Sequence, residues 1–151
     1  MTAITREPTP LSRQGNEAAA TAAHPCAAAL TQAVQTYFDL MYDCDTSRFD
    51  QVFRSTAQLH GFRDGQMVVW PAAIYRDILD KRQSAKSVNA PRADDILLMD
   101  FASATLAFVK VRLRMNTMTY VDYLTWHCID GQWLITSKGY HLESDGAAAV
   151  A

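Results

Sequence analysis

The chain has 151 residues, of which 49% are hydrophobic, 20% charged and 10% aromatic. This length and composition are typical of one folded domain and exclude a wholly disordered chain. The 14 basic and 16 acidic residues give a net charge of -2, which does not favour a nucleic-acid-binding protein. No apolar run approaches the roughly 20 residues that span a bilayer. We therefore expect neither nucleic acid nor a membrane as a partner.

The two ends of the chain differ from its middle in composition. Residues 1–25 are rich in Ala, Thr and Pro and contain no aromatic residue, and residues 144–151 read SDGAAAVA. We interpret both segments as flexible tails on a single domain that covers residues 26–143. The first segment lacks the continuous apolar stretch of a secretory signal, so we expect a cytoplasmic protein.

Three segments have the apolar spacing of helices. Residues 26–44 form the first, with apolar side chains at i, i+3, i+4, i+7, i+8 and i+11: Leu30, Ala33, Val34, Tyr37, Phe38 and Met41. Asp45-Thr46-Ser47 offers an N-cap for a second, short helix. Pro71 fits the first position of a third helix, whose apolar stripe includes Ile74, Tyr75 and Leu79.

The other segments alternate as strands do. A hairpin is predicted over residues 57–69, around Arg63-Asp64-Gly65, and four longer strands over residues 95–101, 104–115, 118–129 and 132–141. Strands of a dozen residues imply a strongly twisted sheet. The segregated helices and strands predict an α+β fold, in which a curved antiparallel sheet packs with three N-terminal helices and encloses a pocket.

Four segments also resemble a known group of proteins, in the same order along the chain. They are residues 37–45 (YFDLMYDCD), residues 49–53 with 57–61 (FDQVF and AQLHG), residues 120–124 (YVDYL), and residues 130–135 with 138–141 (DGQWLI and KGYH). Together they resemble the nuclear transport factor 2-like superfamily, which includes ketosteroid isomerase, scytalone dehydratase and the SnoaL-like proteins. Within it they are most similar to the bacterial group labelled "putative lumazine-binding". The resemblance covers about residues 28–142 and implies a cone-shaped fold.

Three polar residues are candidates for acid–base chemistry. Asp122 lies within an alternating strand, where an inward carboxyl would be desolvated, and the resemblance implies an acidic residue on the corresponding strand. His60 lies near the position of the isomerase's general base, which aligns with Gly61, and a histidine suits proton shuttling. Tyr42, on the first helix, is a candidate oxyanion donor. The alternatives are a structural hydrogen-bond acceptor, a rim or surface histidine and a core tyrosine.

If Asp122 faces the pocket, its carboxyl is expected to be neutral or hydrogen-bonded, with Tyr42 and His60 as the partners. Five aromatic residues are candidates for the pocket wall: Tyr37, Trp70, Tyr75, Trp126 and Tyr140. They favour a small apolar or aromatic ligand, although each also fits a plain core. No side chains have metal-ligand spacing and no glycine-rich phosphate loop occurs, so we expect neither a metal nor a cofactor.

These observations lead to one principal hypothesis and two alternatives. The principal hypothesis is a small-molecule-binding pocket protein. The first alternative is an isomerase, dehydratase or polyketide-cyclase-like enzyme that acts on a small apolar carbonyl compound through Asp122, His60 and Tyr42. The second is a protein-interaction domain. Three helices can cover only one face of the sheet, and the resemblance implies pairing through the other face, so we expect a homodimer.

Overall fold

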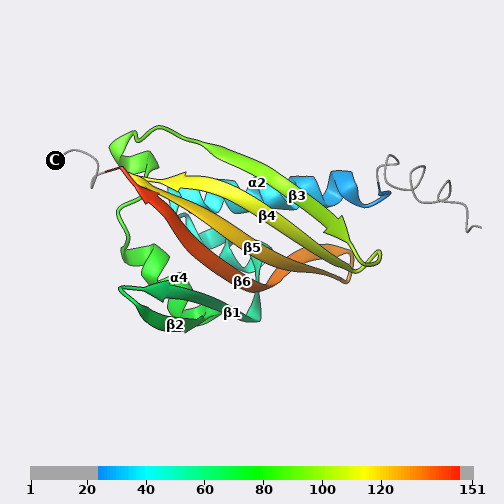
Figure 1. Ribbon diagram of the computed structural model, residues 1–151. Coiled ribbons are helices and arrows are strands. Elements are labelled where there is room, and N and C mark those ends of the chain that lie inside the picture. Colours follow the sequence, from blue (N-terminus) through cyan, green and yellow to red (C-terminus); the bar gives the residue numbers. More distant parts are fainter. Residues whose placement is uncertain (1–23, 147–151) are drawn as a thin grey trace, which may run out of the picture.

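The computed structural model describes residues 24–146, and its elements follow the expected order (Figure 1). The helices are α2 (Ala27–Asp43), η1 (Thr46–Arg48), α3 (Phe49–Val52), α4 (Ala72–Lys81) and η2 (Lys86–Val88). The strands are β1 (Phe53–Arg63), β2 (Gln66–Pro71), β3 (Asp94–Phe101), β4 (Leu106–Met115), β5 (Met118–Ile129) and β6 (Gln132–Asp145). Most of both predicted tails, residues 1–23 and 147–151, lies outside the described residues. Within the described part, no helix is long and apolar enough to cross a membrane.

The six strands form one curved, open sheet in the order β2-β1-β6-β5-β4-β3. Every neighbouring pair is antiparallel except β1 and β6, which run parallel. The helices lie behind the sheet in Figure 1, and the strands β3 to β6 lie in front. This confirms the predicted α+β fold. The parallel pair was not predicted, because hairpin signals report only strands that are adjacent in sequence.

The core lies between α2 and the inner face of the sheet. The buried stripe of α2 is Leu30, Val34, Tyr37, Phe38, Leu40 and Met41. Strand β4 opposes it with alternate buried residues: Ala107, Val109, Val111, Leu113 and Met115. The intervening residues of β4 face the other way, since side chains alternate along a strand. There Arg112 makes two hydrogen bonds to Glu143, at 2.8 and 2.9 Å.

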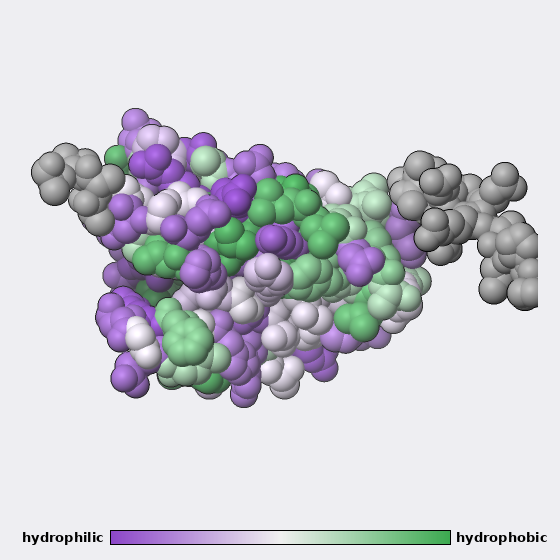
Figure 2. Space-filling view, in the orientation of Figure 1, coloured by the Kyte–Doolittle hydropathy of each residue, from purple (hydrophilic) through white to green (hydrophobic). Residues whose placement is uncertain are grey.

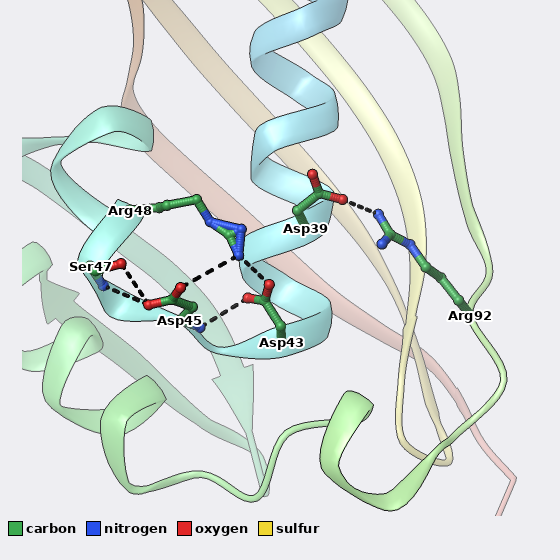
Figure 3. Close-up of polar contacts among 6 residues, drawn as sticks. All are labelled: Asp39, Asp43, Asp45, Ser47, Arg48 and Arg92. Carbon is green, nitrogen blue, oxygen red and sulfur yellow. Dashed lines mark hydrogen bonds and ion pairs between the residues drawn. The ribbon is translucent and has the colours of Figure 1, made fainter.

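The turn after α2 is fixed by paired charges (Figure 3). Asp45 caps η1, and Arg48 pairs with Asp43 and, at 3.9 Å, with Asp45. Arg92, from the loop before β3, reaches across to Asp39 of α2 at 2.6 Å. These carboxylates therefore hold the end of α2 against the neighbouring loops, which sets the position of the helix over the sheet.

One residue of the predicted N-terminal tail packs on the domain. The ring of His24 stacks on Phe101 of β3, with centroids 4.1 Å apart and 7° between the planes. Its Nδ1 accepts a hydrogen bond from the Cys26 backbone N–H at 3.1 Å. His24, which the prediction placed in the N-terminal tail, is therefore held against β3.

Candidate functional site

A cavity of about 430 Å³ lies between the β1–β2 hairpin, α4 and the inner face of β4, β5 and β6. Its floor is made by almost fully buried residues: Leu59, Tyr75, Asp122 and Lys138. Its rim includes three exposed residues at the tip of the hairpin: Phe62, Arg63 and Asp64. The volume falls in the range of cavities that hold small organic molecules.

The floor of the cavity carries an uncommon buried carboxylate. Asp122 is 1% exposed, and its Oδ2 accepts a short hydrogen bond from the Tyr37 hydroxyl and lies 3.4 Å from Lys138 Nζ. Its Oδ1 is also buried but has no hydrogen-bond partner in the described part of the chain. A carboxylate oxygen offers two lone pairs. Asp122, which lines the cavity, therefore has one oxygen without a partner among residues 24–146 while the other is doubly held.

Lys138 is the counter-ion that offsets the cost of burying the Asp122 carboxylate. Its Nζ lies 3.4 Å from the Tyr75 hydroxyl and stands over the rings of Tyr37 and Tyr75, 5.3 and 5.0 Å from their centroids. Burial acts to lower the pKa of Lys138, but the charge of Asp122 and the contacts with Tyr75 outweigh it and raise the pKa above its ordinary value. The stabilisation from a raised lysine pKa is present below the ordinary value of about 10.4 and is lost as the pH rises through the pKa of Lys138.

Tyr37 completes the cluster from the helix side. Burial and then the nearby charge of Asp122 raise its pKa well above the ordinary value, so its hydroxyl remains a donor to Asp122 at neutral pH. Removing one partner of a buried ion pair costs about 3–5 kcal/mol, whereas replacing both by apolar side chains of similar volume is often neutral. The cluster is therefore best tested by replacing Asp122 and Lys138 together.

Lys138 was not among the predicted site residues, because a β-bulge changes the direction of its side chain. Trp133 and Ile135 face inward, so strict alternation would place Lys138 on the outer face. In the pairing of β5 with β6, however, Thr125 opposes Ser137 while Trp126 opposes Ile135, which leaves Thr136 as an extra residue. An extra residue shifts the alternation by one. Lys138 consequently faces inward, opposite Leu124 and close to Asp122.

Aromatic rings form one wall of the cavity. Trp70 stacks on Tyr75 at 6.1 Å and on Tyr140 at 5.8 Å, with about parallel planes. The Tyr140 ring lies against Gly61, where an added Cβ would come within 2.4 Å of it. The position that aligns with the isomerase's base thus has no room for a side chain. The Tyr140 hydroxyl is buried and has no hydrogen-bond partner among residues 24–146.

The structure places five of the eight predicted site residues at or directly behind the cavity. Asp122, Trp70, Tyr75 and Tyr140 line it. Tyr37 is fully buried behind the cavity and contacts two of its lining residues, Asp122 and Lys138. The predicted hydrogen bonding of Asp122 is therefore present, but Tyr37 and Lys138 supply it.

The other three predicted residues are not part of the cavity wall. The Tyr42 hydroxyl donates to the Ala90 carbonyl at 3.0 Å, and Trp126 is fully buried in the core. His60 lies between two inward-facing residues of β1 and so points to the opposite face. The expected convergence of Asp122, His60 and Tyr42 on one space is therefore wrong, because each of the last two lies one residue away from the inward stripe of its element.

The architecture has counterparts in known proteins. A nuclear transport factor 2-like protein of unknown function from Silicibacter pomeroyi has a TM-score of 0.70 at 23% identity, over 77% of this chain and 94% of its own. A ketosteroid isomerase-like protein from Erwinia carotovora atroseptica has a TM-score of 0.64 at 13% identity, over 81% of this chain and 99% of its own. These likenesses show the fold, which many activities share.

The amino-acid sequence is similar to that of one characterised protein and matches one protein family. The aldolase FrzH of Cladobotryum sp is 28% identical over 107 residues, which cover 70% of this chain and 82% of that protein. Residues 26–141 match the family described as "putative lumazine-binding". The chain therefore belongs to this family, and its fold is that of the nuclear transport factor 2-like proteins.

Proposed function

We propose that the cavity binds a small, flat aromatic molecule that donates a hydrogen bond to Asp122 Oδ1. The observation that carries the proposal is this buried oxygen, which lacks a partner at the cavity floor among the described residues. A buried polar atom without a partner costs about 1–3 kcal/mol, which a ligand donor would recover. The stacked rings of Trp70 and Tyr140 offer a surface for an aromatic body.

Binding of 2-naphthol and 2-methoxynaphthalene, measured by calorimetry, tests this proposal. The two compounds have similar ring systems, but only the first has a donor for Asp122. We expect 2-naphthol to bind about tenfold more tightly. The double variant Asp122→Leu/Lys138→Met should lose the preference, since it removes the acceptor together with its counter-charge. His60→Ala, on the other face of β1, is the control and should keep the preference. Equal affinities in the unaltered protein would contradict the proposal.

A second candidate function is acid–base catalysis on a carbonyl compound. In it Asp122 Oδ1 takes a proton from the carbon next to a ligand carbonyl, and the C–H electron pair forms an enolate. The Lys138 ammonium and the Tyr75 hydroxyl, 3.4 Å apart at the cavity floor, would stabilise the negative oxygen. The relation to an aldolase favours this candidate, because aldol chemistry begins with such a proton transfer.

Solvent deuterium exchange into 2-tetralone, followed by proton NMR, tests the catalytic candidate. The protein should accelerate loss of the α-proton signals, by about 100-fold or more for a positioned base. Asp122→Asn retains a hydrogen-bond acceptor but not the base, so the rate should fall to that of buffer. His60→Ala should leave the rate unchanged. Exchange at the buffer rate in the unaltered protein would leave the cavity as a binding site without this chemistry.

We also propose that two copies of the chain pair through the outer face of the sheet. Leu98 of β3 and Tyr123 of β5 are 52% and 46% exposed there, and Phe108 lies beside Tyr123 with ring centroids 5.5 Å apart. Figure 2 has a hydrophobic area over this face, which the helices leave uncovered. Large exposed apolar patches are typical of interaction surfaces.

Light scattering at micromolar concentration tests the pairing. We expect twice the chain mass of 16.8 kDa. Leu98→Glu should reduce the mass to that of one chain, because it places a charge in the proposed interface. Ile74→Glu changes an equally exposed apolar residue on α4, 48% exposed, and should keep the dimer. A mass near 16.8 kDa for the unaltered protein would exclude the pairing.

A further inference from the structure

Two arginines that line the cavity have no carboxylate partner in the described part of the chain. They are Arg63 at the end of β1 and Arg82 at the end of α4. Of the other six arginines in residues 24–146, four pair with aspartate or glutamate: Arg48, Arg76, Arg92 and Arg112. Arg54 is exposed to solvent, and Arg114 donates to the Asn116 carbonyl at 2.8 Å. Arg63 and Arg82 therefore differ from the rest in lining a cavity while their guanidinium groups remain available.

Of the two arginines, Arg82 gives the stronger indication of what the ligand carries. It is half-buried, and the one hydrogen bond of its side chain within residues 24–146 goes from Nη1 to the Met115 sulfur at 3.8 Å. A thioether is a weak acceptor, while a guanidinium has five N–H donors in a planar fork. Partial burial raises the cost of leaving these donors unpaired. An acceptor from a ligand would satisfy them.

The other charges around the cavity limit what this acceptor can be. Lys138 is already paired with Asp122 at the floor. Asp145 accepts a hydrogen bond from the Thr117 hydroxyl at 3.1 Å, and Asp64 is exposed in the hairpin turn. The charges of these two arginines and two carboxylates balance, so a ligand with a single negative charge disturbs the lining less than a doubly charged one. The floor is an ion pair without net charge, so the guanidinium groups at the rim offer such a ligand the stronger attraction.

The electrostatic environment of the wall agrees with this arrangement. Burial raises the pKa of Tyr120, and the positive charges of Arg82, Arg63 and Lys138 each act to lower it. Tyr120 lies on β5, two residues before Asp122, and lines the same cavity. Three cations therefore act on one side chain of the wall.

We propose that the ligand is an aromatic hydroxy acid, whose carboxylate binds Arg82, with Arg63 beside it, at the rim while its hydroxyl reaches Asp122. The planar guanidinium matches a carboxylate with two parallel hydrogen bonds. This inference rests on the proposed binding function and adds the chemical class of the ligand. Bicyclic aromatic acids are in the size range of a cavity of about 430 Å³.

Calorimetry at pH 7 with 6-hydroxy-2-naphthoic acid and its methyl ester tests the inference. The compounds share the ring and the hydroxyl donor and differ in charge at the other end. We expect the acid to bind about tenfold or more tightly than the ester. Arg82→Met should reduce the affinity for the acid to near that for the ester and leave the ester unchanged. Arg76→Met, on the same helix but outside the cavity wall, is the matched control and should alter neither affinity.

The outcomes separate this inference from the function on which it rests. Arg63→Met should also weaken binding of the acid. Because Arg63 is exposed, this change should not disturb folding, so the result does not depend on the Arg82 variant being folded. If acid and ester bind equally well, or if Arg82→Met weakens both alike, the carboxylate assignment is overturned while the binding function stands. If neither compound binds, the binding function itself fails and the inference falls with it.

Discussion

The ion pair between Asp122 and Lys138 is the constraint on which the rest of the site depends. Both side chains are removed from water, at 1% and 4% exposure, so each must be satisfied by the protein. Tyr37 and Tyr75 provide the remaining polar and cation–π contacts, and they come from α2 and α4. The position of the helices over the sheet is thus tied to the charge at the floor of the cavity.

Two backbone features make this arrangement fit the sheet. The extra residue at Thr136 turns Lys138 inward, and the absence of a side chain at Gly61 lets the Tyr140 ring lie close to β1. Without the bulge, the lysine would face the outer surface and Asp122 would lack its counter-charge. The resulting cavity combines an ion pair at its floor, an aromatic wall and, at its rim, two arginines without carboxylate partners in the described part of the chain. This arrangement suits a ligand that carries different chemical groups at its two ends.

Much of the fold follows from local sequence patterns. The features that were not predicted depend on contacts between residues far apart in the sequence. The alternation in β4 and the stripe of α2 were sufficient for the α+β fold. The sequence pattern left the direction of Asp122 open, and the structure buries its side chain at the cavity floor. The parallel pairing of β1 with β6 joins segments separated by α4, η2 and four other strands, so no hairpin signal could predict it.

The site was harder to predict for the same reason. Tyr37 already belonged to the apolar stripe of α2, and this spacing favoured it over Tyr42 as the inward tyrosine. No comparable signal existed for Lys138, since its direction depends on a bulge that only the strand pairing reveals. His60 has suitable chemistry, but its neighbour Leu59 faces the cavity in its place. Residue type alone therefore identified side chains with suitable chemistry, but it did not predict which of them point into the cavity.

The central claim is that Lys138 is held as a buried ammonium ion by Asp122, and its titration measures this directly. In protein labelled with ¹³C at lysine Cε, the Lys138 resonance should titrate above the ordinary lysine value of about 10.4, because the charge of Asp122 outweighs burial. In Asp122→Asn the attraction is removed while burial remains, so the pKa should fall below that in the unaltered protein. A Lys138 pKa below the ordinary value in the unaltered protein, or one that Asp122→Asn does not change, would contradict the account.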